Sequence, residues 1–145
     1  MKAFLDTSVL VAAFYADHVH HQSSLDLFVR YGKNNACCGA HSLAEVYATL
    51  TTMPGQRRVA GDAAMLFLSD IRERLTLIAL DPAEYYAAID QAAANGTAGA
   101  AIYDALLGHC ACKAGAEAIY TWNLKDFRRL PDPIPERVRQ PEQAT

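Results

Sequence analysis

Short apolar runs alternate with longer segments of helical character along this chain, and the alternation restricts the folds that it can adopt. The apolar runs lie at residues 2–5, 36–40, 75–80 and 118–121, and helix-type segments separate them. Parallel strands need a long crossover between them, whereas antiparallel neighbours can be joined by a tight hairpin. The pattern therefore predicts an α/β fold with three layers, in which helices flank a central parallel sheet of four to five strands.

Helix start and stop signals divide the segments between these strands. Asp81-Pro82 combines a capping acid with a proline at the first helical position, and Gly32 marks a helix end. Residues 57–74 are predicted to form one continuous amphipathic helix. The predicted helices cover residues 9–14, 20–31, 42–50, 57–74, 82–95 and 103–115, and the fourth is expected to bury Val59, Ala63, Leu66, Phe67 and Ile71.

Length and composition fit one domain, which we expect to span residues 1–145. The chain has 145 residues, 52% of them hydrophobic, which is enough to bury a sizeable core. Residues 131–145 carry four of the six prolines, so we expect a surface tail there with at most a short edge strand near Val138. No apolar run reaches the roughly 18 residues of a membrane span. We therefore expect a soluble, cytoplasmic protein whose four cysteines are buried thiols.

The formal charge of −3 argues against a nucleic-acid partner, because phosphate contacts usually need a basic surface. That objection weakens if several of the acids bind divalent cations, which supply their own positive charge. The remaining cations could then form a local basic rim. The candidates for contact with RNA are Arg57, Arg58, Lys125, Arg128 and Arg129.

Four acids occupy equivalent places, just after a strand or early in a helix. Each has a plain structural explanation. Asp6 can cap a helix, Ser42 and Glu45 have the spacing of a capping box, and Asp104 sits where a helix dipole favours an anion. Asn123 could be another N-cap, with Asp126 three residues on. Taken singly, each of the four acids Asp6, Glu45, Asp104 and Asp126 is better explained as part of a helix start.

Taken together, the four acids indicate more than capping. Helices that follow parallel strands begin at one edge of the sheet, so acids at several helix starts converge there. Converging carboxylates repel each other, and a hard cation relieves that repulsion. Oxygen ligands of this kind suit Mg²⁺ or Mn²⁺.

Several stretches of the sequence resemble the PIN-domain ribonucleases, and among them most closely the VapC toxins of bacterial toxin–antitoxin pairs. The matching stretches are Leu5-Asp6-Thr7-Ser8-Val9-Leu10, Glu45 in a mid-chain helix, Ile102-Tyr103-Asp104-Ala105-Leu106, and Thr121-Trp122-Asn123-Leu124-Lys125-Asp126-Phe127. They occur in the family's order and spacing, and the resemblance extends over essentially the whole chain.

The resemblance implies a five-stranded parallel sheet and an acidic pocket of Asp6, Glu45, Asp104 and Asp126 that holds Mg²⁺ or Mn²⁺. It also implies hydroxyls near the metal from Thr7 or Ser8 and from Thr121, with Asn123 orienting a carboxylate. The implied partners are an RNA substrate, a VapB-like antitoxin that lies across the pocket, and a second copy of the chain in a homodimer.

Metal-assisted attack by water would leave a 5′-phosphate and a 3′-hydroxyl. If His41 or His109 were instead a general acid or base, the products would be 2′,3′-cyclic phosphates. Two further alternatives remain. One is a PIN-like module that binds RNA or protein without cutting, and the other is an aspartyl-phosphate phosphatase, although Ser8 stands where such enzymes need a second acid.

Two other groups of residues have competing interpretations. The cluster of His18, His20 and His21 could bind a transition metal, but it is more typical of a polar turn before an exposed helix. Trp122, the one tryptophan in the chain, could stack on a base or pack against the edge of the sheet.

Overall fold

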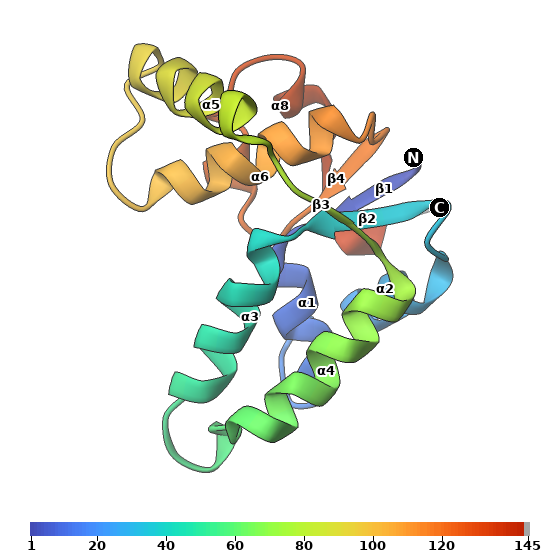
Figure 1. The fold of residues 1–145 in the computed structure, drawn as a ribbon. Coiled ribbons are helices and arrows are strands. Elements are labelled where there is room, and N and C mark those ends of the chain that lie inside the picture. The colour runs from blue at the N-terminus through green and yellow to red at the C-terminus, as the bar shows by residue number, and fades with distance from the viewer. Residues whose placement is uncertain (144–145) are drawn as a thin grey trace.

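A five-stranded sheet lies at the centre of the computed structural model, which describes residues 1–143 (Figure 1). Its strands run in the spatial order β3-β2-β1-β4-β5, and every neighbouring pair is parallel. The predicted α/β fold with a parallel sheet is therefore confirmed. The strands are β1 (Ala3–Leu5), β2 (Ala36–Gly39), β3 (Thr76–Ile78), β4 (Ala118–Tyr120) and β5 (Val138–Arg139).

Helices cover both faces of this sheet. In Figure 1 the first four α-helices lie on one side of the strands, and α5, α6 and α8 lie on the other. Within residues 1–143, no helix is both long and apolar enough to cross a membrane. The helices are α1 (Thr7–Phe14), α2 (His21–Arg30), α3 (His41–Thr52), α4 (Gly61–Arg74), α5 (Pro82–Ala94), α6 (Ala101–Lys113), α7 (Leu124–Phe127) and α8 (Ile134–Arg137), with 3₁₀ turns at Gly55–Arg57 and Pro141–Gln143.

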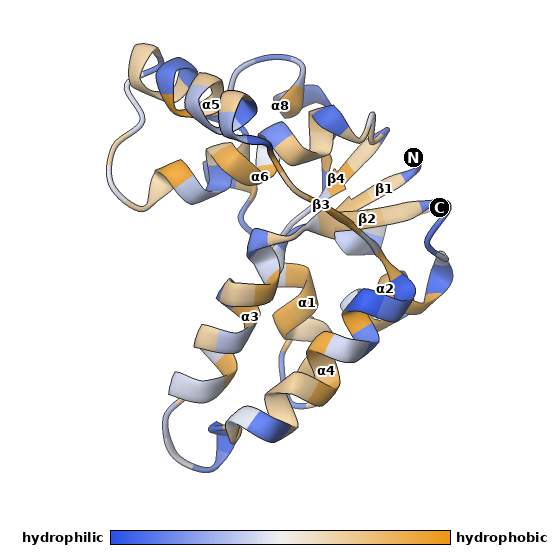
Figure 2. Cartoon of the chain, in the orientation of Figure 1, coloured by the Kyte–Doolittle hydropathy of each residue, from blue (hydrophilic) through white to orange (hydrophobic). Residues whose placement is uncertain are grey.

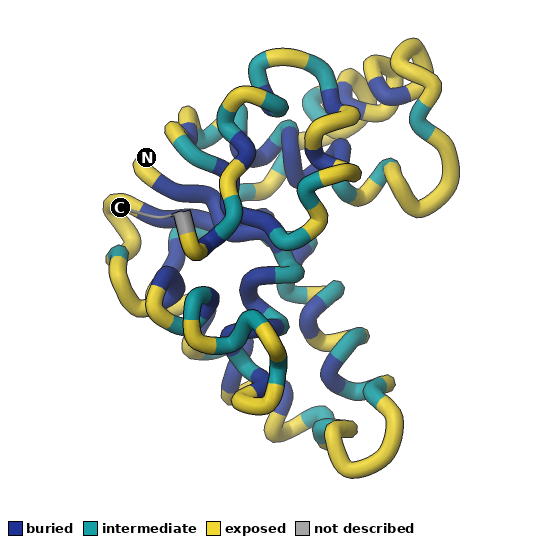
Figure 3. The backbone as a smooth tube through the Cα atoms, turned by 180° about the vertical axis from the view of Figure 1, so that it is seen from behind, coloured by how far each residue is buried: buried dark blue, intermediate teal, exposed yellow. Residues whose placement is uncertain are grey.

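Alternating strand residues supply the two halves of the core. In β1, Ala3 and Leu5 pack with the α1–α4 side, whereas Phe4 packs with the α5–α8 side. A sheet covered on both faces needs apolar residues in both directions, and the strands accordingly have hydrophobic colours in Figure 2. Figure 3 shows the central strands β1 and β2 as buried along their whole length, whereas β3 at the edge is of intermediate burial. Three of the four cysteines, Cys37, Cys38 and Cys110, are buried free thiols as predicted, and Cys112 is half-buried.

The predicted continuous helix over residues 57–74 is wrong. The chain makes a 3₁₀ turn at Gly55–Arg57 and stays extended until α4 begins at Gly61. Gly55 has φ +64°, a conformation that favours glycine, and it lets the chain reverse between α3 and α4. Within α4 the buried face is formed by Ala64, Phe67, Leu68 and Ile71, while the predicted Leu66 is 72% exposed and Ala63 is also exposed.

The prediction of a surface tail after residue 131 is also wrong in part. The short edge strand near Val138 is confirmed as β5, which pairs with β4. However, the same stretch contributes Ile134 and Val138 to the core, where they are 3% and 4% exposed. Gly108 makes room for Ile134, since a Cβ at Gly108 would lie 2.8 Å from Ile134 Cδ1. Residues 144–145 of the predicted tail lie outside the described residues.

We expect Ile134→Ala to lower the free energy of unfolding by about 2–4 kcal/mol, because it removes buried methyl groups and leaves a cavity beside α6. Leu66→Ala is the matched control, and as an exposed change it should cost less than about 0.5 kcal/mol. Urea denaturation of both variants measures the difference. Equal effects of the two substitutions would mean that the C-terminal segment does not belong to the core.

Candidate active site

The candidate site lies where the order of the strands reverses. After β1 the chain builds β2 and β3 on one side of that strand, and later adds β4 and β5 on the other side. In open parallel sheets, ligands bind outside the carboxyl ends of the strands at such a switch point. Asp6 directly follows β1 and Thr121 directly follows β4, so both stand at this position.

Asp6 is the buried centre of the site, with 1% of its surface exposed. Its Oδ2 accepts hydrogen bonds from Thr121 Oγ1 at 2.7 Å, from Ser8 Oγ at 2.8 Å and from the backbone N–H of Ser8 at 3.4 Å. Burial raises the pKa of the Asp6 carboxyl, and these donors oppose that rise because they favour the charged form. The predicted capping role of Asp6 is confirmed, since it is the N-cap of α1.

Glu45 is held by a residue of a different helix. The Thr7 hydroxyl, on α1, donates toward Glu45 Oε1 at 3.0 Å and lies 2.9 Å from Ser42 Oγ. The predicted capping box of Ser42 and Glu45 is wrong, because α3 begins at His41, two residues earlier than that box requires, with Ala40 as the N-cap. Burial raises the pKa of the Glu45 carboxyl, opposed by the Thr7 hydrogen bond and the His41 side chain, while the Asp6 charge adds to the rise.

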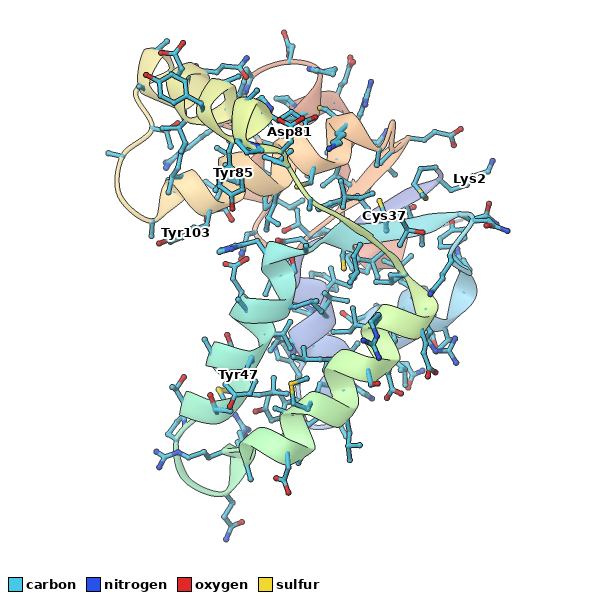
Figure 4. The ribbon with its side chains drawn as sticks, viewed as in Figure 1. Lys2, Cys37, Tyr47, Asp81, Tyr85 and Tyr103 are labelled. Carbon is cyan, nitrogen blue, oxygen red and sulfur yellow. The ribbon has the colours of Figure 1, made fainter. Side chains whose placement is uncertain are left out.

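Asp104 lies in the first turn of α6, as predicted, and it carries the clearest sign that the acids converge. Burial raises the pKa of its carboxyl to about 7, with further contributions from the charges of Asp6, Asp126 and Glu45. Next to it, Tyr103 stacks on His41 with ring centroids 5.2 Å apart, which joins the start of α6 to the start of α3. Figure 4 shows Tyr103 at the beginning of α6, on the side that faces α3.

The four predicted acids are distributed over two neighbouring hollows. Asp6, Glu45 and Asp104 line one cleft of about 550 Å³. Asp126 is exposed on α7 and lines a second hollow of about 270 Å³, to which Asp104 also contributes. Asp104 thus forms the boundary between a three-acid cleft and the hollow that contains the fourth acid.

The chemistry of these donors fits a hard divalent cation. Within residues 1–143 no three His, Cys, Asp or Glu side chains are placed to share one metal ion. Mg²⁺ does not require such a cage, because it retains several waters and uses one or two carboxylates. The side chains nearest Asp6 and Glu45 offer only carboxylate and hydroxyl oxygens. Burial is the main cause of the raised pKa of Asp104, and the negative charges of Asp6, Asp126 and Glu45, which a cation would offset, add to it.

The predicted supporting residues divide by role. Ser8 and Thr121 bind Asp6, and Thr7 binds Glu45. Asn123 lines the cleft and stands at the N-cap of α7, but its side chain makes no capping hydrogen bond. Its backbone N–H instead donates to Thr121 Oγ1 at 2.9 Å.

The structure adds a wall to the cleft that the sequence did not reveal. His18, Val19 and His20, in the loop between α1 and α2, line the cleft together with Trp122. Sequence reasoning treated these histidines as a polar turn, and no spacing rule relates this loop to the acids. His41 and His109 do not line the cleft, and His109 pairs with Gln91 at 2.7 Å.

The predicted basic residues are spread around the site rather than collected in it. Arg57 pairs with Asp17 at 2.6 Å, and Arg58 Nε donates to the Met53 carbonyl at 3.1 Å. Arg129 lines the second hollow beside Asp104 and Asp126. Lys125 and Arg128 are exposed on and just after α7.

Comparison with known proteins identifies the family to which this fold and site belong. The PIN-domain family matches residues 3–133. This chain belongs to the PIN-domain family. It is also 37% identical over 114 residues to ribonuclease VapC40 of Mycobacterium tuberculosis, covering 79% of this chain and 81% of that protein.

Solved structures of other PIN-type proteins have the same fold. VapC20 of Mycobacterium tuberculosis, described as a toxin that cleaves the sarcin-ricin loop, aligns with a TM-score of 0.70 at 17% identity, covering 86% of this chain and 92% of that one. VapBC2 of Rickettsia felis, bound to a DNA fragment from its promoter, aligns with a TM-score of 0.65 at 19% identity, covering 97% and 98%. At such identities the likeness concerns the fold, and it confirms the PIN-like sheet.

In this PIN domain, Asp104→Asn should stabilise the metal-free protein at pH 8. A carboxyl whose pKa is raised to about 7 binds a proton more tightly in the folded state, so its contribution to stability grows as pH falls through 7 toward 4. Above pH 7 the Asp104 carboxyl is ionised, which destabilises the folded protein relative to the unfolded one. The uncharged side chain of the asparagine variant does not have this destabilising effect. After allowance for solvent screening, we expect a gain of about 1–2 kcal/mol at pH 8 that disappears near pH 4.

Urea denaturation in EDTA at several pH values measures this difference. Asp70→Asn, an exposed change on α4, is the matched control and should be neutral. A loss of stability at pH 8 in Asp104→Asn would show that the carboxylate is needed for the fold itself.

Proposed function

We propose that this protein is a VapC-type endoribonuclease that hydrolyses RNA phosphodiester bonds with the help of Mg²⁺ or Mn²⁺. The observation that carries the proposal is the three-acid cleft at the strand switch point, in a chain 37% identical to a ribonuclease over most of its length. We further propose that residues 1–145 act as one PIN domain in the cytoplasm.

The acids would share the work of holding the cation and the substrate. Asp6, Glu45 and Asp104, and Asp126 from the second hollow, would hold the cation partly through the waters that it retains, since no three of these side chains are placed to share one ion directly. A cation bound there lowers the pKa of a water molecule and offsets charge on the phosphoryl oxygens. Hydrogen bonds from Thr121 and Ser8 fix the position of the buried Asp6 carboxyl and favour its charged form, and the Thr7 hydroxyl does the same for Glu45.

The distribution of charge suggests how RNA would lie. The residues that line the three-acid cleft include no lysine or arginine within the described part of the chain. Arg129 stands in the neighbouring hollow, with Lys125 and Arg128 close by in sequence, so phosphates leaving the cleft on the Asp104 side would meet these cations. Arg57 and Arg58 are weaker candidates, because each already has a protein partner.

The same cleft supports a proposal about partners. We propose that a VapB-like antitoxin inhibits the protein by laying a segment with a basic residue across the three acids, and that the toxin is a homodimer. A positive side chain would offset the repulsion between Asp6, Glu45 and Asp104, as the cation does. The proposal is also in line with the likeness in fold to VapBC2 of Rickettsia felis, which is described as bound to a DNA fragment from its promoter.

Incubation of the purified protein with total bacterial RNA tests the nuclease. With Mg²⁺ or Mn²⁺ we expect discrete cuts that carry 5′-phosphates, and no cuts in EDTA. Asp104→Asn should reduce the rate by at least about 100-fold, because it removes a carboxylate that would hold the cation beside the anionic phosphoryl group. This variant, prepared identically, also controls for contaminating nuclease.

The ends of the fragments distinguish the alternatives. Ends with 2′,3′-cyclic phosphates would favour acid–base catalysis by a histidine of the cleft wall over the metal-dependent route. RNA binding without cleavage under any divalent cation would favour a PIN-like binding module. A phosphoryl group trapped on Asp6 would favour the phosphatase, although Ser8 binds Asp6 and no lysine lines the cleft within residues 1–143.

Expression in a bacterium tests the toxin role separately. We expect induction of the wild-type protein to arrest growth, and Asp104→Asn at the same protein level to leave growth unchanged. Optical density and viable counts after induction measure the effect. Normal growth in the presence of a nuclease that is active in vitro would refute the toxin role and leave the ribonuclease assignment in place.

A further inference from the structure

A pair of stacked aromatic rings forms part of the wall of the three-acid cleft. The imidazole of His20 lies on the indole of Trp122, with ring centroids 3.7 Å apart and planes only 8° from parallel. Both residues line the same cleft as Asp6, Glu45 and Asp104, and both are partly exposed. A flat, partly exposed double ring beside the proposed catalytic acids is a surface on which a nucleobase can stack.

Trp122 is fixed in relation to the acids. Its backbone N–H donates to Ser8 Oγ at 3.0 Å, and Ser8 Oγ in turn donates to Asp6 Oδ2 at 2.8 Å. Its indole Nε1 donates to Ser24 Oγ at 2.8 Å, and Ser24 is fully buried. One hydroxyl therefore connects the position of the indole to the position of the catalytic carboxylate.

His20 is positioned by the loop that precedes α2. Its backbone N–H donates to His18 Nδ1 at 3.0 Å, and it occupies the N-cap of that helix. The His18 ring is 5.7 Å away and tilted by 42°, so it does not lie parallel on His20. Val19, between the two histidines, is 86% exposed and adds an apolar side chain to the same wall.

The charge of the cleft indicates which part of RNA meets this wall. Carboxylates line the cleft, and among its described lining residues there is no lysine or arginine that could bind a phosphate. RNA entering on the His20 side is therefore bound through its bases rather than its backbone. A base inside a duplex is already stacked and paired, so the surface suits an unpaired nucleotide.

We propose that His20, backed by Trp122, is the stacking platform for an unpaired nucleobase next to the scissile phosphate, and so a determinant of which RNA is cut. The proposal rests on the ribonuclease function proposed above. It assigns the substrate class as single-stranded or looped RNA, and it gives a role to the loop between α1 and α2.

Trp122 is the one tryptophan of the chain, so its fluorescence reports directly on stacking at this wall. The experiment titrates a 12-nucleotide single-stranded oligoadenylate into the full-length Asp104→Asn protein in EDTA, where cleavage cannot occur. We expect the strand to quench Trp122 fluorescence. His20→Ala in that background should weaken binding about 5-fold or more, because stacking on one base is typically worth that much.

Three comparisons separate a stacking role from a structural one. His20→Phe, which keeps a flat ring, should restore binding. His109→Ala, a histidine change outside the cleft, should have no effect. A strand of abasic ribose phosphates should bind to the protein that retains His20 as weakly as the normal strand binds to the His20→Ala protein. The His20→Ala substitution should not weaken binding of the abasic strand any further.

The outcomes also separate this proposal from the proposed function. Binding without quenching, absence of binding, or equal affinity of His20→Ala and His109→Ala would overturn the platform, whether or not the wild-type protein cuts RNA. Binding that quenches Trp122 and depends on His20, together with no cleavage by the wild type under any divalent cation, would support the platform and refute the nuclease.

Discussion

The hydrogen bonds that hold Asp6 are the interaction on which the site depends. A carboxylate with 1% exposure is costly to bury unless donors surround it, and here Thr121 and Ser8 supply them at 2.7 and 2.8 Å. Thr121 comes from the end of β4 and Asp6 from the end of β1, so one hydrogen bond joins the two central strands at the switch point. The acid is therefore both a ligand candidate and part of the structure that positions the other acids.

Much of this arrangement could be predicted because it follows from local pattern. The hydrophobic pattern and the turn and capping residues predicted where the strands lie. In a parallel sheet, acids that directly follow strands meet at one edge of the sheet. For that reason Asp6, Glu45 and Asp104 could be brought together without coordinates. The capping interpretation of Glu45 failed because α3 begins at His41, before Ser42. Glu45 instead accepts a hydrogen bond from Thr7 on another helix, a contact that no spacing along the chain encodes.

What the sequence could not provide was tertiary contact between irregular segments. The His18–His20 loop has no apolar period, so nothing in it indicated that it folds back onto Trp122. A turn interrupts the predicted helix before α4, and within α4 tertiary packing buries Ala64 and Leu68 in place of the predicted Ala63 and Leu66. The C-terminal segment was misjudged for a similar reason, since its prolines indicate surface while Gly108 of α6 leaves a place for Ile134.

The strand order has a consequence for the protein as it is made. Thr121, which donates a hydrogen bond to Asp6, lies 115 residues further along the chain. The strand β5 follows and pairs with β4 to complete the sheet. A nascent chain lengthens from its N-terminus, so Asp6 leaves the ribosome long before the strand that fixes it. The site therefore cannot assemble before β4 has been synthesised, because Thr121 at the end of that strand supplies a hydrogen bond that holds Asp6.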